Sequence, residues 1–380
     1  PTQPPESGED HAALFADDRF PSATACAPCH EDIYREWSVS SHAYAQMSPV
    51  FNAMHATILK QTNGTNGDFC IRCHTPVGMN LEEPEFMSNL DRSSTSREGI
   101  TCVVCHRLDR PYGKISGRLP IVEGSVYDPV FGPSGNAELA RAIESGEYNL
   151  QTDPDRAGRG VHREVREFAQ LPTPGLCGAC HDVNLVNGFR LEEAFSEYKH
   201  TPAAAAGTTC QDCHMGKDPG VPNGYAMGPA ARVGDRETAV RKRTNHMFAG
   251  PDYSIVHPGI FPHNTEAQEL ATLREWLTFD VDAGWGTDEF EEQVTDDTEF
   301  SSRWVEPDDR YDAADILRDN LDLLAEMGRQ RLQVLQAGYQ LGEVVVERAD
   351  DGGVKFRVEV KNGTNGHNVP TGFDAERVVW

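Results

Sequence analysis

The chain has 380 residues, and its 34 basic and 60 acidic side chains give a formal net charge of −26. Such a charge disfavours nucleic acid and anionic membrane surfaces as partners. No run of about 18 apolar residues occurs, so no transmembrane segment is expected. The length predicts two or three domains, and the hydrophobic fraction of 38% predicts only a modest protein core.

The first 20 residues are polar and rich in proline, with little periodicity. We expect residues 1–20 to form an N-terminal tail, at the start of a mature chain from which a signal peptide has been removed. Residues 21–265 follow as the first predicted domain, and they contain all ten cysteines of the chain.

Every cysteine belongs to a Cys-x-x-Cys-His segment, and there are five such segments. In chain order they are Cys26-Ala-Pro-Cys29-His30, Cys70-Ile-Arg-Cys73-His74, Cys102-Val-Val-Cys105-His106, Cys177-Gly-Ala-Cys180-His181 and Cys210-Gln-Asp-Cys213-His214. This pattern attaches c-type haem. The two thiols reach the two vinyl groups on one porphyrin edge, and the histidine supplies the proximal nitrogen to iron.

Paired cysteines also form zinc sites and redox dithiols. Five copies, each followed by histidine and with no cysteine left over, leave those alternatives little room. The sequence therefore predicts five covalently bound haem c groups, with the proximal ligands His30, His74, His106, His181 and His214.

Residues 21–265 should form a pentahaem cytochrome domain that is mainly α with extensive loops, organised around stacked haems. Short helices are expected over residues 32–38 and 48–60, and loops rich in glycine and proline over 119–136 and 218–232. Only 27 residues separate the second and third motifs, and 28 separate the fourth and fifth, which favours adjacent haems within each pair. The long stretch of residues 107–176 is expected to loop out and return with a distal ligand.

Segments around the motifs resemble a known family. They include Tyr34-Arg35-Glu36-Trp37, Ser41-His42-Ala43, Phe69 to Pro76, Gly99-Ile100-Thr101-Cys102 and Gly207 to Met215. The chain is similar, over roughly residues 20–260, to multihaem cytochromes related to the tetrahaem electron acceptor of hydroxylamine oxidoreductase. The resemblance implies electron transfer, or haem enzymology where one iron has an open position. A fifth motif and a long C-terminal region depart from the tetrahaem pattern.

Nine histidines lie outside the motifs, and five distal ligands are needed if every iron binds two imidazoles. The resemblance implies distal ligands at His42 and His162. His246 follows the last motif and has no other evident task. Met47, Met215 and Met247 are alternative axial ligands, although methionine more often serves packing.

Four further histidines are distal candidates with competing interpretations. His200 lies ten residues before Cys210, near enough to bind a neighbouring haem, but it is equally well explained as a solvent-exposed side chain. The same two interpretations apply to His257. His55 fits either a ligand or the surface of the helix over residues 48–60. His367 fits either a turn that ends a hairpin or a ligand at the contact between domains.

Residues 266–340 should form an acidic linker, with a helical start over 266–277, followed by an amphipathic helix over 312–337 that packs on the haem domain. Residues 341–380 should form a C-terminal β segment, with a hairpin that turns at Asp350-Asp351-Gly352-Gly353. Related chains carry a G-H-x-x-P-T-G segment, like the one that begins at Gly366, inside a β-sandwich. A small sandwich, incomplete in this chain, is therefore expected.

Two classes of function fit these patterns. The first is electron transfer through mostly bis-histidine haems, in a respiratory or extracellular pathway and as a polymerising conduit. The alternative is a haem oxidoreductase that acts on a small nitrogen or sulfur compound at one open iron. All five motifs end in histidine, which favours the carrier, so no catalytic residue is predicted.

The expected partners are redox proteins or an extracellular electron acceptor, and further copies of the chain. A periplasmic or extracellular location is expected, because covalent haem attachment takes place outside the cytoplasm.

Overall fold

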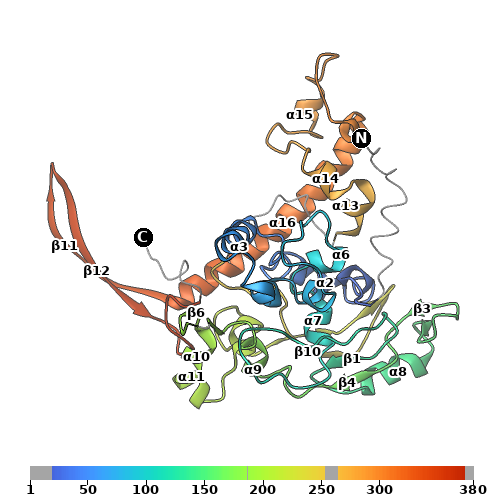
Figure 1. The fold of residues 1–380 in the computed structure, drawn as a ribbon, viewed down its shortest axis with the longest axis horizontal. Coiled ribbons are helices and arrows are strands. Elements are labelled where there is room, and N and C mark those ends of the chain that lie inside the picture. The colour runs from blue at the N-terminus through green and yellow to red at the C-terminus, as the bar shows by residue number, and fades with distance from the viewer. Residues whose placement is uncertain (1–18, 186, 253–263, 373–380) are drawn as a thin grey trace.

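The structure is a computed structural model that describes residues 19–185, 187–252 and 264–372. Figure 1 shows a body of short helices and loops, crossed by one long helix, α16 (Pro307–Gly338). One end of α16 carries a column of short helices, and the other end continues into a protruding hairpin. The arrangement of helices, loops and small sheets fits the expected cytochrome c-like fold class.

The body contains short helices joined by loops. In chain order they are η1 (Ala23–Ala25), α2 (Glu31–Ser38), α3 (Pro49–Thr62), η2 (Gly67–Phe69), α4 (Ile71–His74), α5 (Pro76–Asn80), α6 (Ser94–Arg97), α7 (Cys102–His106), α8 (Ala137–Ser145), α9 (Pro174–Cys177), α10 (Ala194–Tyr198), α11 (Pro202–Ala205) and α12 (Cys210–His214). The helices expected over 32–38 and 48–60 are α2 and α3. The side chain of Ser48 caps α3 by accepting from Phe51 N, and Asn63 ends it in a left-handed conformation.

The strands of the body form only two-stranded sheets within the described residues. Parallel pairs are β1 (Val130–Gly132) with β4 (Val165–Glu167) and β2 (Leu150–Gln151) with β3 (Arg159–Gly160). Antiparallel pairs are β5 (Val183–Asn184) with β6 (Arg190–Glu192), β7 (Ala226–Pro229) with β10 (Val240–Arg243), and β8 (Arg232–Val233) with β9 (Arg236–Glu237). The loops expected over 119–136 and 218–232 thus include short strands.

The protein core is divided into small clusters. The largest cluster joins Phe20, Val103, Leu108 and Phe131 from the segments around the first and third motifs. Ion pairs are buried elsewhere, as between Arg92 and Glu83 at 2.7 Å. A core that is divided into small clusters agrees with the chain's modest hydrophobic content of 38%.

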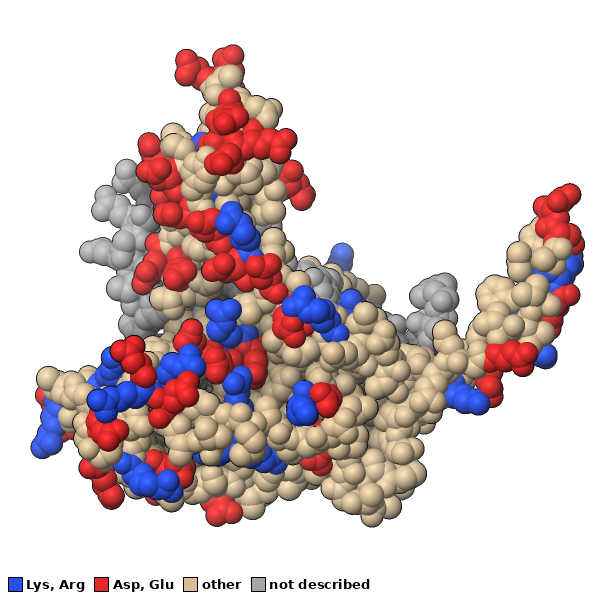
Figure 2. Space-filling model, turned by 180° about the vertical axis from the view of Figure 1, so that it is seen from behind, with Lys and Arg blue, Asp and Glu red and all other residues tan. Residues whose placement is uncertain are grey.

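The column at one end of α16 contains α13 (Thr265–Leu270), α14 (Leu273–Trp276), α15 (Asp288–Glu291) and η3 (Ser302–Trp304). The helix expected over 266–277 is two helices, because Ala271 is extended and Thr272 starts α14 with a capping box to Glu275. Trp276 and Trp304 pack there with ring centroids 5.3 Å apart. Acidic side chains crowd the surface of the column in Figure 2.

Helix α16 packs on the body through a narrow stripe. Leu324 and Met327 are buried against Val39, Met247 and Ala249, which also gives Met247 a packing role. The expected contact with the body is therefore present. However, Leu321 and Leu332 of the predicted apolar face are 44% and 53% exposed, so the stripe is narrower than the sequence suggests.

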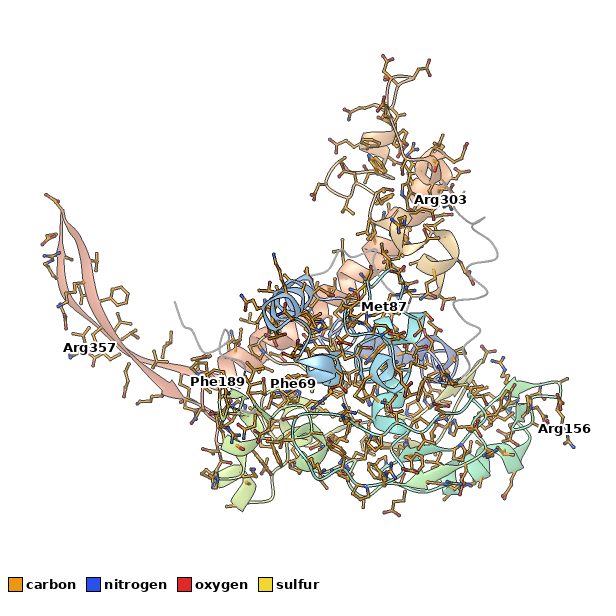
Figure 3. All side chains as sticks on the ribbon, in the orientation of Figure 1. Phe69, Met87, Arg156, Phe189, Arg303 and Arg357 are labelled. Atoms are coloured by element: carbon orange, nitrogen blue, oxygen red, sulfur yellow. The ribbon has the colours of Figure 1, made fainter. Side chains whose placement is uncertain are left out.

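The C-terminal hairpin pairs β11 (Tyr339–Asp350) with β12 (Gly353–Asn362) around the expected turn. Cross-strand partners place one row of apolar side chains on the same face: Leu341, Val344, Val346, Ala349, Val354, Phe356, Val358 and Val360. Figure 3 shows these strands standing clear of the body. The described residues form a hairpin in this region, and the expected sandwich is not seen in them.

None of the helices in the described residues is both long and apolar enough to cross a membrane.

We predict that Leu324→Ala destabilises the chain by about 2–5 kcal/mol, because it leaves a cavity under α16. The matched change Leu332→Ala, on the exposed side of the same helix, should cost no more than about 0.5 kcal/mol. Denaturant unfolding followed by far-ultraviolet circular dichroism measures both. Equal effects of the two substitutions would contradict the packing described for α16.

Candidate haem-binding site

Local helical structure prepares the motifs for haem. The third and fifth motifs form α7 and α12, and α4 covers the second motif from Ile71 to His74. Residues three and four apart lie on one face of a helix, so both cysteines and the histidine can face the same porphyrin. All ten cysteines are partly buried and none forms a disulfide. The donor set of each motif therefore fits covalent haem c.

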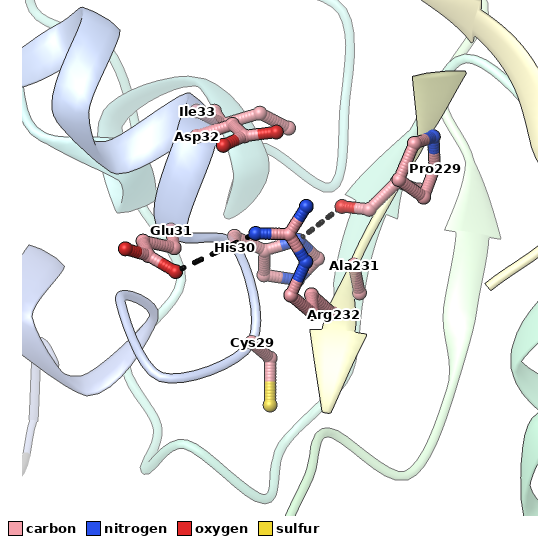
Figure 4. A pocket seen from close by; sticks show the side chains of 9 residues that line it. Cys29, His30, Glu31, Asp32, Ile33, Pro229, Ala231 and Arg232 are labelled. Atoms are coloured by element: carbon pink, nitrogen blue, oxygen red, sulfur yellow. Dashed lines mark hydrogen bonds and ion pairs between the residues drawn. The ribbon is translucent and has the colours of Figure 1, made fainter. Parts of the chain in front are cut away.

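Four of the five motif histidines are held through Nδ1 by a backbone carbonyl. His30 Nδ1 lies 2.7 Å from Ala230 O, and His106 Nδ1 lies 2.7 Å from Phe131 O. Figure 4 shows His30 between Glu31 and the segment that carries Ala231 and Arg232. The distances are 2.8 Å for His74 to Ala45 O and for His214 to Ala249 O. Donation from Nδ1–H fixes the tautomer and leaves the Nε2 lone pair for iron.

His181 is held differently, because its Nδ1 faces a carboxylate. Glu192 Oε1 lies 3.6 Å away, which is an ion-pair distance rather than that of a full hydrogen bond. Burial alone would lower the pKa of His181, but the nearby carboxylate of Glu192 raises it to about 9. Sequence reasoning did not single out Glu192.

Two predicted distal histidines lie opposite motif histidines at the distance that iron requires. The ring centroids are 6.1 Å apart for His42 and His181, and 6.2 Å apart for His214 and His367. Two imidazoles on one metal, each at a metal–nitrogen distance of about 2.0 Å, would have centroids about 6 Å apart. Each pair thus leaves room for one iron between its rings.

Two further candidates neighbour the first and third motifs. Burial, and then the charge of His30, lowers the pKa of His162 to about 4. Burial, and then the charge of His106, lowers the pKa of His246 to about 4. Both rings are therefore neutral at pH 7, which is the protonation state that binds a metal.

His55, on α3, is the candidate nearest to the second motif. Its ring is 5% exposed, and its Nε2 has no hydrogen-bond partner in the described structure. Charge interaction with His55 contributes, after burial, to lowering the pKa of His74 to about 4. The ring of Phe51 stacks on both, with centroids 3.7 Å from His74 and 5.3 Å from His55. An unpartnered buried nitrogen here fits an iron ligand.

The remaining two candidates are not brought to a motif. His200 is exposed just after α10. His257 lies outside the described residues. Of the seven candidates, His42 and His367 thus lie opposite motif histidines, and the charge interactions of His55, His162 and His246 with motif histidines place these three near the motifs.

Thiols of different motifs touch one another. The pKa of Cys26 is lowered chiefly by its interaction with Cys102, so the thiols of the first and third motifs are neighbours. The pKa of Cys73 is likewise lowered by Cys180, and that of Cys210 by Cys177, so thiols of the second and fifth motifs both lie beside the fourth. The adjacency of haems expected within each pair of motifs stays a prediction.

A buried carboxyl group ties the first and third motifs together. Glu98 accepts hydrogen bonds from the Ser22 hydroxyl, from Ala23 N at 3.0 Å and from the Thr101 hydroxyl at 2.6 Å. Burial raises the pKa of Glu98 to about 7 in spite of these three donors. Glu98 was not identified from the sequence, although Gly99-Ile100-Thr101-Cys102 was.

Residues 25–107 match the family model described as cytochrome c554 and c-prime. Among solved structures, a penta-heme cytochrome c552 from Thermochromatium tepidum is 24% identical, with a TM-score of 0.38. The match covers 60% of this chain and 57% of that chain, and at this TM-score it carries no further argument. No curated protein matches the chain.

The attachment motifs and the family match together define a multihaem c-type cytochrome. Its cofactor is haem c, and its chemistry is haem-based electron transfer. The match to the cytochrome c554 and c-prime model covers the first three motifs only.

We predict that His42→Ala gives one new high-spin ferric signal in the electron paramagnetic resonance (EPR) spectrum, because the iron at His181 loses its second imidazole. Haem content should not change, since the thioether bonds remain. The control His200→Ala removes an exposed histidine and should leave the spectrum as in the wild type. An unchanged spectrum in His42→Ala would remove His42 from the ligands.

Proposed function

We propose that the chain binds five haem c groups and acts as an electron carrier in an oxidising, extracytoplasmic compartment. The observation that carries the proposal is the spacing of two imidazole pairs, with ring centroids 6.1 Å apart for His42 and His181 and 6.2 Å apart for His214 and His367. The proposed pairs are His30 with His162, His74 with His55, His106 with His246, His181 with His42, and His214 with His367. Two imidazoles keep iron low-spin in both oxidation states, so little rearranges on electron transfer.

Contacts between thiols support a connected path. Cysteines of the first and third motifs touch, and cysteines of the second and fifth motifs each touch the fourth. The charge of Cys105 also reaches Cys177 and Cys180, which links the third motif to the fourth. We infer a path from the first motif through the third to the fourth, with branches to the second and fifth.

Charge and cysteine usage support the compartment and the partner. All ten cysteines serve attachment motifs, and haem is attached covalently outside the cytoplasm. The net charge of −26 favours redox partners with basic docking surfaces or a cationic extracellular acceptor.

Three measurements test the proposal. Intact mass after denaturation should exceed the apoprotein mass by five haem units, and coulometric titration should deliver five electrons per chain. The EPR spectrum of the oxidised wild type should show only low-spin signals. Fewer than five haems would overturn the stoichiometry, and a high-spin signal in the wild type would favour an oxidoreductase with one open iron.

The hairpin formed by β11 and β12 supports a second part of the proposal, which is that several copies of the chain assemble into an electron-conducting chain. Its apolar face is open, with Leu341 72%, Val354 63% and Phe356 58% exposed. Residues 339–362 contain five acidic and four basic side chains, so the hairpin is nearly neutral in a chain of −26. Identical hairpins can therefore meet without the repulsion that opposes contact elsewhere, and we propose that a second copy covers this face.

We predict that Phe356→Gln weakens self-association, as measured by sedimentation at several concentrations, because it places an amide in the apolar face. Arg357→Gln, on the opposite face of the same strand, is the control. Both variants keep His367, so their haem spectra should match the wild type. The conduit is excluded if the wild type stays monomeric at high concentration or if Phe356→Gln associates as tightly.

A further inference from the structure

The fourth motif is set apart by what holds its histidine. His30, His74, His106 and His214 each donate from Nδ1 to a neutral backbone carbonyl. His181 alone among these five faces a carboxylate, with Glu192 Oε1 at 3.6 Å from its Nδ1.

Local structure fixes the position of Glu192. It lies on β6 directly opposite Val183 of β5, and β5 begins two residues after His181. The short hairpin is fastened by Asp182, which is fully buried and accepts hydrogen bonds from both Arg190 and Ser196. The carboxylate is therefore part of the same built turn as the ligand.

The nearby cation is directed elsewhere. Arg190 binds Asp182 through Nη2 and approaches Glu193 through Nε at 3.2 Å. Glu192 is only 18% exposed, so solvent screens its charge weakly.

A carboxylate beside Nδ1–H makes the imidazole a stronger electron donor to its metal. Stronger donation and a nearby negative charge stabilise ferric iron more than ferrous iron, which lowers the reduction potential. A neutral carbonyl also strengthens donation by the imidazole, but to a smaller degree, and it places no negative charge near the iron. The five motifs are thus not equivalent electrostatically.

We propose that Glu192 is a positioning residue that lowers the reduction potential of the iron at His181. The inference rests on the proposed haem ligation. The fourth motif touches the second and fifth through Cys180 and Cys177, so the low-potential site lies at the branch point of the path. Electrons then reside on the surrounding haems and cross the branch point rather than accumulate there.

The test is a redox titration of holoprotein followed by optical and EPR spectra, comparing the wild type with Glu192→Gln. The variant removes the charge but keeps the size of the side chain. One midpoint potential should rise, and the other four should stay. The g-values of the most affected haem should change too, because its imidazole becomes a weaker donor. Glu192→Asp, which keeps the charge, should give a smaller shift.

Glu193→Gln is the matched control, because it removes the same charge from the adjacent position, beside Arg190. It should leave the potentials in place. His42→Ala assigns the shifted signal, since its new high-spin iron is the one at His181. If the potentials do not move in Glu192→Gln, or move equally in Glu193→Gln, Glu192 does not tune the potential. The proposal of five bound haems is unaffected by that result. A chain without haem at the fourth motif overturns both proposals, and the intact mass distinguishes the cases.

Discussion

On the proposed ligation, each haem iron binds a nitrogen on both faces, and the protein has to hold these two nitrogens at a fixed separation. The proximal nitrogen comes from the motif itself, and the second comes from a segment that is distant in sequence. His42 precedes its proposed partner His181 by 139 residues, whereas His367 follows His214 by 153. This ligation ties together, through iron, loops with little regular structure of their own, and it fits a fold of short helices and two-stranded sheets.

The same constraint explains the buried polar groups. Where haem occupies the interior, apolar side chains cannot form one continuous core, and the clusters around Phe131 and Met247 remain small. Neighbouring motifs are then aligned by hydrogen bonds. Glu98 collects three donors from the segments before the first and third motifs, at the point where Cys26 touches Cys102. Its burial is unfavourable for a charged carboxylate, so the group is kept for alignment rather than for net stability.

Local patterns in the sequence predicted local structure well. The helices α2, α3 and α16, the hairpin turn and the ten motif cysteines all follow from spacing and periodicity. Contacts between distant segments were less predictable. Proximity in sequence suggested adjacent haems at the second and third motifs, but it gave no sign that Cys73 lies beside Cys180 of the fourth motif. Glu192 escaped notice because a glutamate on a three-residue strand carries no sequence signal until β6 pairs with β5.

Electrostatics differs between the surface and the interior of this chain. On the surface, acidic side chains crowd the column around α15, where solvent screens them (Figure 2). Near the motifs, the rings of His162 and His246 are neutral, and the carbonyl partners of four motif histidines are neutral as well. Glu192 beside His181 is 18% exposed, so its charge is weakly screened and acts at short range. Motifs with the same Cys-x-x-Cys-His pattern can therefore have different reduction potentials. At the fourth motif, the difference comes from Glu192, on the segment that follows the motif.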